Sequence, residues 1–256
     1  MKITKPDMKK NFYLLTISVL LIAIFTNCKK DVDVIDPEGK WIMINGIKWA
    51  TCNLATHGQF VEKPEDYGAL FQWGRIGDGH EQRTSPNYPT NDDSSETGVV
   101  SGSGLNANGQ VVSTHDAYGK FIKQSESPYD WCAPQNNALW NSGTANTPKK
   151  AANDPCPAGW RVPTVKELAN LQSSFSYCDY LNSVEGYYFG NSNEKLFLPI
   201  AGSRFYHSGG LGSMSGNYWS STVTDFSPNF LHLWGDSVDV YRAHRACGFS
   251  VRCVVE

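Results

Sequence analysis

The sequence predicts a disulfide-stapled α+β domain built from short mixed or antiparallel strands, few helices and long loops. Two observations lead to this fold class. Aromatic residues make up 12% of the chain and charged residues 18%, and Gly, Asn and Ser are abundant, a composition typical of a loop-rich exported fold. Six cysteines lie beyond residue 50, an even number that suits as many as three disulfide bonds in an exported chain.

One helix is predicted, from about residue 164 to residue 174. Thr164 and Glu167 have the spacing of a capping box and stand immediately before apolar Leu168. In such a box each side chain satisfies a backbone N–H group that the helix start would leave unpaired. The prolines and the glycine of Pro155–Gly159 indicate a tight turn before the helix.

Two hairpins are predicted. Asn45-Gly46 separates the apolar runs 41–44 and 47–50, and this dipeptide readily adopts the positive φ angles of a type I′ turn. A second hairpin is expected from Phe230–Trp234 and Val238–Tyr241. Further strands are predicted at Leu196–Ile200, Tyr218–Thr222 and Phe249–Val254. The alternation of the last run predicts that one of its faces is buried.

The stretch Ser85–Thr114 differs from its surroundings, being rich in Asn, Asp, Ser, Thr and Gly. We expect a mobile surface excursion with a small hairpin between Val99-Val100 and Val111-Val112. A structureless loop of this length is unusual in a compact domain, so the stretch is either functional or tolerated. We favour the second interpretation.

The N-terminus predicts export. Four lysines precede the uncharged apolar run Phe12–Phe25. Its 14 residues are fewer than the roughly 20 that a membrane-spanning helix needs, and this combination is typical of an export signal. Phe25–Cys28 resembles a bacterial lipobox, which implies lipidation of Cys28. An ordinary secretory signal with an incidental cysteine is the alternative.

These features divide the chain into three parts: a lipoprotein signal peptide at 1–27, a tether at 28–39 and a domain at 40–256. Lys29–Asp33 is similar to the charged segments that route some Bacteroidetes lipoproteins to the cell surface, and a solvated tether is the alternative. We therefore expect an exported outer-membrane lipoprotein whose N-terminal lipid holds it to the membrane, with its domain at the cell surface.

Charge argues against nucleic acid as a partner. Residues 1–27 carry four lysines and Asp7, so the rest of the chain has 18 basic and 24 acidic residues and a net charge near −6. Lys149-Lys150 is its main basic pair. Neutralising a phosphate backbone needs several clustered cations.

The residues alone leave fifteen pairings of the six cysteines open. These are Cys52, Cys132, Cys156, Cys178, Cys247 and Cys253. Zinc binding competes with disulfide formation, but no Cys-x-x-Cys and no close Cys/His spacing supports it. We expect no metal and no cofactor.

Six blocks of the sequence resemble one family, in the expected order along the chain. They are Trp49–Ala55, Tyr67–Arg75, Cys156–Leu168, Leu198–Gly202, Tyr218–Thr222 and Ser250–Val254. Together they are similar to the Fibrobacter succinogenes major paralogous domain, which occurs on lipoproteins of Bacteroidetes and related bacteria. The resemblance spans nearly all of residues 40–256, but it implies no particular activity, because the biochemical role of the family is largely unknown.

A more distant resemblance implies a finer fold. Arg161–Leu168 and Gly248–Arg252 are similar to blocks of sulfatase-modifying-factor domains, which implies a C-type-lectin-like architecture. The N- and C-terminal strands pair in that fold, so the resemblance implies a Cys52–Cys253 bond. The other bonds we expect are Cys132–Cys156 and Cys178–Cys247. Fold alone implies no function.

Several activities lack their motifs. Cys247 and Cys253 are the only close cysteine pair, and their spacing suits structural bonding better than redox catalysis. Gly-x-Ser-x-Gly and His-Glu-x-x-His are both absent, which disfavours the common hydrolases. The lectin calcium tripeptides are absent too, and Asp92-Asp93 and Asp78-Gly79 do not offer the spaced oxygen ligands that calcium prefers. Calcium-free recognition stays open.

One polar constellation is a candidate binding site: Gln72, Trp73, Arg75, Asp78 and His80. An aromatic ring beside planar donors suits recognition of carbohydrate or peptide. The alternative, which we favour, is that Trp73 fills the core while Arg75 and Asp78 form an internal salt bridge.

A second aromatic group contains Tyr187, Tyr206 and His207, which the distant resemblance places on long loops. Asp236-Ser237-Val238 matches a short O-glycosylation pattern that some Bacteroidetes use on exported proteins, so Ser237 is a glycosylation candidate.

The leading functional hypothesis is an envelope-anchored, non-catalytic module for binding or adhesion, with a glycan or a protein as its ligand. Lipid anchoring, abundant aromatic residues and the missing catalytic motifs favour it. One alternative is an envelope enzyme whose site is assembled only in space. Another is a structural component of a surface assembly such as a fimbria.

Overall fold

The first predicted hairpin is confirmed in the computed structural model, which describes residues 40–90 and 96–256. Trp41–Ile44 (β1) pairs with Ile47–Ala50 (β2). Between them, Asn45 and Gly46 have φ angles of 48° and 81°, as a type I′ turn requires. Both strands place residues in the core through Ile44 and Trp49.

The strands form four sheets of three or four strands and three two-stranded ladders. One sheet has the order β1, β2, Val254–Val255 (β20), Trp160–Arg161 (β10). Another contains Phe175–Leu181 (β11), Val184–Gly190 (β12) and Lys195–Pro199 (β13). A third has the order Leu211–Gly212 (β15), Ser203–Arg204 (β14), Gly248–Phe249 (β19), Phe71–Gln72 (β5). The fourth contains Gly216–Thr224 (β16), Ser227–Trp234 (β17) and Ser237–Arg242 (β18).

The two-stranded ladders lie in the loop-rich part of the chain. One is the antiparallel pair Leu54–Thr56 (β3) and Gln59–Phe60 (β4). The other two are parallel: Asn87–Tyr88 (β6) with Phe121–Ile122 (β8), and Val100–Ser101 (β7) with Cys132–Ala133 (β9). A short 3₁₀ turn, η1, covers Gly102–Gly104.

The predicted helix is confirmed as Val165–Gln172 (α1), with Thr164 as its N-cap. The capping box forms, since the Glu167 backbone N–H donates to the Thr164 hydroxyl and the Thr164 N–H donates to the Glu167 carboxylate. Glu167 also accepts two bonds from the Arg161 guanidinium, at 2.7 and 2.6 Å. The helix start is therefore tied to β10.

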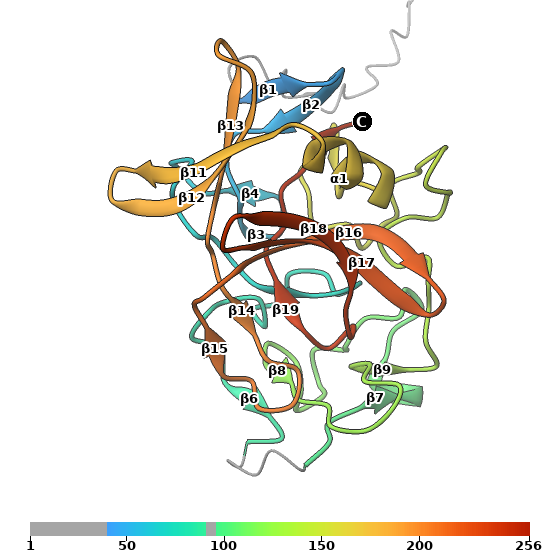
Figure 1. Cartoon of the computed structure of the whole chain (residues 1–256). Coiled ribbons are helices and arrows are strands. Elements are labelled where there is room, and N and C mark those ends of the chain that lie inside the picture. The colour runs from blue at the N-terminus through green and yellow to red at the C-terminus, as the bar shows by residue number, and fades with distance from the viewer. Residues whose placement is uncertain (1–39, 91–95) are drawn as a thin grey trace, which may run out of the picture. The chain divides into compact units, whose positions relative to one another are not determined.

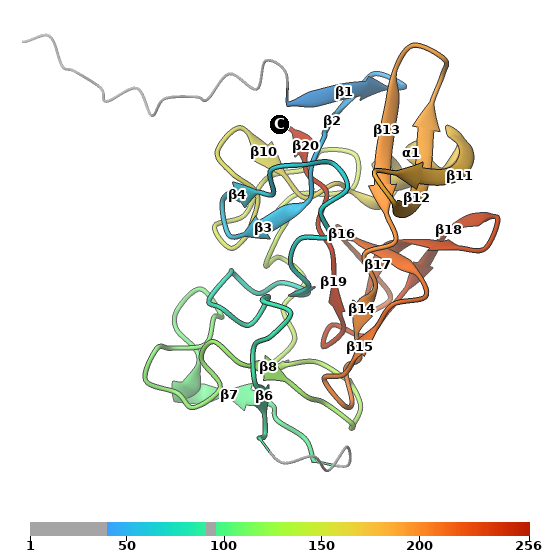
Figure 2. The same cartoon turned by 90° about the vertical axis from the view of Figure 1, so that its left-hand side faces the viewer.

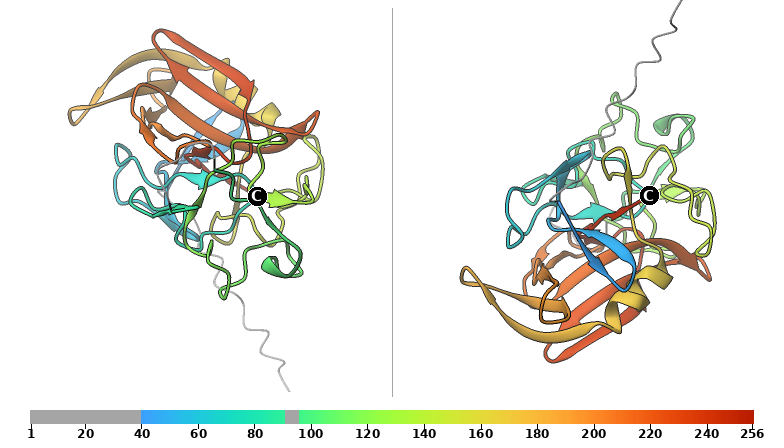
Figure 3. Two further views of the ribbon diagram at one scale, coloured as in Figure 1. Left: turned by 90° about the horizontal axis from the view of Figure 1, so that it is seen from below. Right: turned by 90° about the horizontal axis from the view of Figure 1, so that it is seen from above.

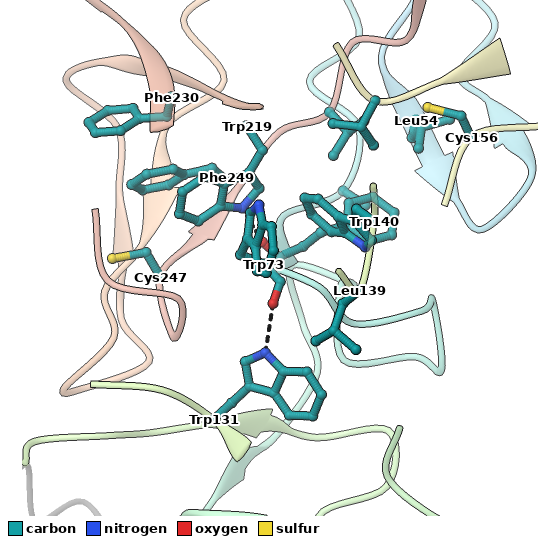
Figure 4. Packing of buried hydrophobic residues seen from close by; sticks show 14 of the residues in the cluster. Leu54, Trp73, Trp131, Leu139, Trp140, Cys156, Trp219, Phe230, Cys247 and Phe249 are labelled. Atoms are coloured by element: carbon teal, nitrogen blue, oxygen red, sulfur yellow. Dashed lines mark hydrogen bonds between the residues drawn. The ribbon is translucent and has the colours of Figure 1, made fainter. Parts of the chain in front are cut away.

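Two hydrophobic clusters form the core. The first centres on four fully buried tryptophans, Trp73, Trp131, Trp140 and Trp219, most of which interleave in Figure 4. Each indole N–H of the four donates to a backbone carbonyl. The second cluster packs Leu168 of α1 against the β16–β18 sheet, and Figures 1 and 3 show the helix beside that sheet.

The C-terminal run departs from the prediction of one strand with one buried face. It contains two short strands, β19 and β20, which belong to different sheets and follow one another through the molecule in Figure 2. Both faces of the run are buried, including Ser250 and Arg252. Burial of this arginine is tolerated because it donates to the backbone of Ala50 and Thr51 and to the Asn53 side chain.

The expected cysteine pairing is wrong. Cys253 bonds to Cys156, not to Cys52, and the other two expected bonds do not form. The four remaining cysteines of the described residues are free thiols: Cys52, Cys132, Cys178 and Cys247. The reason lies in the first sheet, where β20 pairs with β10 as well as with β2. This pairing brings the C-terminus beside the segment that contains Cys156.

Two further expectations need correction. Tyr187 lies in β12, within a β11–β12 hairpin that the sequence did not reveal, rather than in a long loop. In the 85–114 stretch, Val99-Val100 does not pair with Val111-Val112. Instead Val100 pairs with Cys132, and Leu105 forms a bridge to Val111. Val100 and Val111 are buried. Val100 and Val111 thus anchor the described part of this stretch to the core, while Val99 and most of its other residues remain at the surface.

The predictions for residues 1–39, including the signal peptide, Cys28 and the tether, concern residues that the structure does not describe, as does Asp92-Asp93. Within residues 40–90 and 96–256, no helix has the length and apolar character that a bilayer crossing requires.

Candidate functional site

The constellation expected around Trp73 is mainly a buried support. Trp73 and Arg75 are 0% and 1% exposed, and the Arg75 guanidinium pairs with the Asp78 carboxylate at 2.5 Å. Arg75 also donates to the Gln72 side chain and to the Lys120 carbonyl. The sequence therefore identified a true cluster, and the favoured alternative of an internal salt bridge is present in the structure.

His80 is held in one neutral tautomer. Its Nε2 accepts the Gln72 backbone N–H at 3.1 Å, so its Nδ1 has the proton and donates to Asp78 at 2.7 Å. Burial, with the nearby Arg75 charge adding to it, lowers the pKa of His80. Burial alone would raise the pKa of Asp78, but Arg75 and His80 hold it well below its usual range.

Asp78, His80 and Glu81 lie close enough together to be considered as a metal site, a grouping that the sequence spacing did not suggest. Their ligand atoms are already engaged. Both His80 nitrogens have partners, and the Glu81 oxygens accept from the Thr56 hydroxyl and the Gly79 N–H. A cation would have to displace the His80 proton and compete with Arg75, so this donor set fits an internal hydrogen-bond network better than a metal.

A concave site lies directly outside this network. It is a polar cleft of about 500 Å³, within the range of small-molecule sites. Its rim includes residues 76–78 of the loop that follows Trp73, and the opposite side comes from the 85–114 stretch and from Asn153. The lining residues are Ile76, Gly77, Asp78, Asn106, Asn108, Gln110, Val111, Val112, Ser113, Tyr118, Ala152 and Asn153. We call this site the amide cleft.

Three amide side chains support the amide cleft: Gln110 joins its two sides, and Asn153 and Asn106 fix the turn that contains Asn108. Gln110 accepts from the Ile76 N–H at 2.7 Å and donates to the Gly74 carbonyl at 3.0 Å. Asn153 donates to the Asn108 carbonyl at 2.8 Å. Asn106 accepts from two backbone N–H groups of its own turn. These contacts fix the backbone on both sides.

Other groups at the amide cleft are free for a ligand. The Tyr118 side chain is 43% exposed. The Asn108 amide and the Ser113 hydroxyl make no side-chain hydrogen bond within the described part of the chain. The only carboxylate lining the cleft is that of Asp78, which is paired. The cleft thus offers amides, hydroxyls and one aromatic ring, and no unpaired charge.

Gly74 sets the position of this loop. Its φ is +84°, and a Cβ added there would lie 2.6 Å from Leu139 Cδ1. Only glycine meets both conditions without strain. The glycine that follows Trp73 therefore has a local structural cause.

The structure separates the second group of candidates. Tyr187 is 1% exposed, and its hydroxyl donates to the Gly235 carbonyl at 2.5 Å, so it ties β12 to the β17–β18 turn. Tyr206 and His207 are at least partly exposed and adjoin Tyr129 and His244. Ser237 is exposed at the same β17–β18 turn.

The free thiols do not form a reactive centre. Burial raises the pKa of Cys132, and raises that of Cys247 to about 12, so neither is a thiolate near neutral pH. Burial also raises the pKa of Cys178. Cys52 lines a larger hollow of about 640 Å³ with Phe60 and Trp160. Lys40 also lines this hollow and adjoins residues that the structure does not describe. We therefore assign no role to the hollow.

The chain matches no family model, no curated protein and no solved structure. Its function has to be argued from the site.

Proposed function

We propose that this protein is a non-catalytic recognition module of the cell envelope that binds neutral glycans through the amide cleft. One observation is the basis of this proposal: the loop beyond Trp73 lines a polar concave site whose unengaged groups are the Asn108 amide, the Ser113 hydroxyl and the exposed Tyr118 side chain. Sugars present hydroxyls that pair with amides and C–H faces that pack on aromatic rings.

The electrostatics favour a neutral ligand over an acidic one. No cationic side chain lines the cleft within the described residues, and the Arg75 guanidinium behind it is already paired. An anionic sugar would leave its charge without a partner on desolvation, which costs binding free energy.

The same features argue against an enzyme. Asp78 and His80 are the nearest acid and base, and each already has its hydrogen bonds inside the protein. A general base needs a free lone pair directed at the substrate. The fimbrial alternative has no specific contact in its favour.

The proposal includes anchoring through Cys28 and membership of the Fibrobacter succinogenes major paralogous domain family with a C-type-lectin-like fold. The short strands, the single helix of the described residues and the disulfide bond at the C-terminal strand support this fold. The lipobox and the net charge near −6 support the envelope location.

The test is an array of neutral and acidic oligosaccharides, probed with the full-length protein in mild detergent. We expect binding to neutral glycans. Tyr118→Ala and Asn108→Ala should each weaken it about tenfold, the effect of about 1.4 kcal/mol.

Matched controls are Tyr180→Ala, which removes an exposed tyrosine of β11, and Asn193→Ala, which removes an exposed asparagine before β13. Both should bind like the unaltered protein. An empty array, or equal losses in cleft variants and controls, would refute the proposal.

A further inference from the structure

Five aromatic rings form a continuous group outside the amide cleft. The Tyr129 and His244 rings lie 4.2 Å apart, and Tyr206 meets the His244 ring edge-on at 4.6 Å. His207 adjoins Tyr206 at 5.0 Å and stacks with Phe205 at 6.0 Å. We call this group the aromatic platform. It combines three loops far apart in the sequence, and all five residues are at least partly exposed.

Buried ions hold two of these loops from below. Asp130 and Arg245, the immediate neighbours of Tyr129 and His244, approach to 3.4 Å and are 1% and 2% exposed. Arg245 also donates to the Asn136 carbonyl at 2.9 Å and lies over the Trp73 ring. Breaking a buried pair of this kind is costly, so the two rings above it have a fixed separation.

The third loop is held by hydrogen bonds of a buried arginine rather than by an ion pair. Arg204, 4% exposed, donates to the Ser85 carbonyl at 2.6 Å and to the Asn87 side chain at 2.8 Å. The Gln124 N–H donates to the Tyr206 carbonyl at 2.7 Å. The rings are therefore pre-organised, and a ligand would lose little free energy in ordering them.

The backbone of Tyr129 is strained. Its φ is +57°, a left-handed conformation that costs a bulky residue about 1–2 kcal/mol. Glycine or asparagine would adopt it more easily. Such strain persists where the surrounding structure enforces it and is concentrated at functional sites. Here it places an aromatic ring on His244.

The polar atoms of the platform differ from those of the core. The indole N–H groups of Trp73, Trp131, Trp140 and Trp219 and the hydroxyls of the buried Tyr187 and Tyr218 donate to carbonyls, and Trp49 is the exception among the fully buried tryptophans. In contrast, no side-chain hydrogen bond forms at Tyr129, Tyr206, His207 or His244 within residues 40–90 and 96–256. Two phenol hydroxyls and two imidazoles thus stay available beside ring faces.

We propose that the aromatic platform is a second glycan contact, which packs a neutral sugar ring against Tyr206 and His244 and hydrogen-bonds its hydroxyls through the free polar atoms. The inference rests on the proposed function for its ligand class, but it uses different residues. A glycan long enough to reach both sites would bind more tightly than either site alone allows.

The test uses full-length protein and neutral hexasaccharides of glucose, mannose, galactose and N-acetylglucosamine as probes. Affinity is measured by calorimetry, and the imidazole signals of His207 and His244 are followed by NMR. We expect Tyr206→Ala to weaken binding about tenfold, while Tyr180→Ala changes it less than about twofold. In Tyr118→Ala, which impairs only the cleft, the hexasaccharide should still shift the His244 signal.

The outcomes separate the two proposals. Loss of binding in Tyr118→Ala with no effect of Tyr206→Ala and no imidazole shift overturns the platform and leaves the cleft intact. The reverse pattern overturns the cleft and supports the platform. If no hexasaccharide binds the unaltered protein, the glycan assignment of the platform is wrong. Tyr129→Gly gives an independent check: it removes the ring that packs on His244 and should therefore abolish the imidazole shift. Because glycine adopts the positive φ of this position without strain, the protein should stay folded.

Discussion

Removing the disulfide bond tests both the pairing and the way in which the C-terminal strand is held. In the double variant Cys156→Ala and Cys253→Ala, β20 keeps its ladders to β2 and β10 but loses its covalent link to the segment before β10. Alanine is chosen because both cysteines are buried, and a serine hydroxyl would add an unpaired polar group.

The magnitude follows from the length of chain that the bond closes. The two cysteines are 97 residues apart in the sequence. For a loop of that size, the loss of unfolded-chain entropy corresponds to about 4.7 kcal/mol at 25 °C. Measured effects are usually smaller, so we expect the free energy of unfolding to fall by about 2–4 kcal/mol. This is a large part of the total stability of an ordinary domain, about 5–15 kcal/mol.

The assay is urea unfolding followed by tryptophan fluorescence, which the buried Trp73 and Trp219 should report well. Cys52→Ala is the control, because it removes a cysteine without removing a bond. Peptide mapping of the oxidised protein should show Cys156 linked to Cys253. A stability loss below about 1 kcal/mol, or a map that links Cys253 to Cys52, would refute this reasoning.

Two smaller predictions concern the helix start and a buried carboxyl group. Thr164→Ala removes the capping-box hydroxyl and should lower the free energy of unfolding by about 1 kcal/mol. The control is Thr147→Ala, at an exposed turn, which should change the free energy of unfolding less. Equal effects of the two substitutions would contradict the capping role. Burial raises the pKa of Asp130 to about 6 from 3.8, so its contribution to stability is complete below about pH 3.8 and is lost as the pH rises through 6. Asp130→Asn should therefore reduce the fall in the free energy of unfolding between about pH 4 and pH 7. Part of the fall should persist in this variant, because burial also raises the pKa of Asp154 to about 6. The free energy of unfolding is measured by urea unfolding at several pH values. If it depends on pH equally in Asp130→Asn and in the unaltered protein, Asp130 does not titrate in this range.

Local signals predicted the elements that depend on a few neighbouring residues. The β1–β2 hairpin follows from the conformational freedom of Asn45-Gly46, and α1 follows from the reciprocal bonds of Thr164 and Glu167. The second hairpin was also predicted near its observed position. Each signal spans four residues or fewer, so distant parts of the chain had little influence on it.

The amide cleft could be predicted only in part. Asp78 was identified from the sequence as a candidate binding residue. The opposite side of the cleft includes Asn108 and Ser113, which belong to the stretch that we expected to be merely tolerated, and Tyr118, which follows that stretch. Nothing in the pattern of that stretch shows which loop it faces, because asparagine and serine have the same local preferences in a free loop and in a binding site.

Turns, the helix cap and the general character of a cysteine-containing, strand-rich domain follow from the sequence, which also predicts an export signal. Tertiary structure alone decided which cysteines pair, how the C-terminal run divides between two sheets, and which polar side chains meet at the amide cleft and the aromatic platform. The physical reason is the separation along the sequence between the residues that interact. Capping and turn formation depend on bonds within a few residues, whereas Cys156 with Cys253, or Tyr129 with His244, come together only when the whole core has packed.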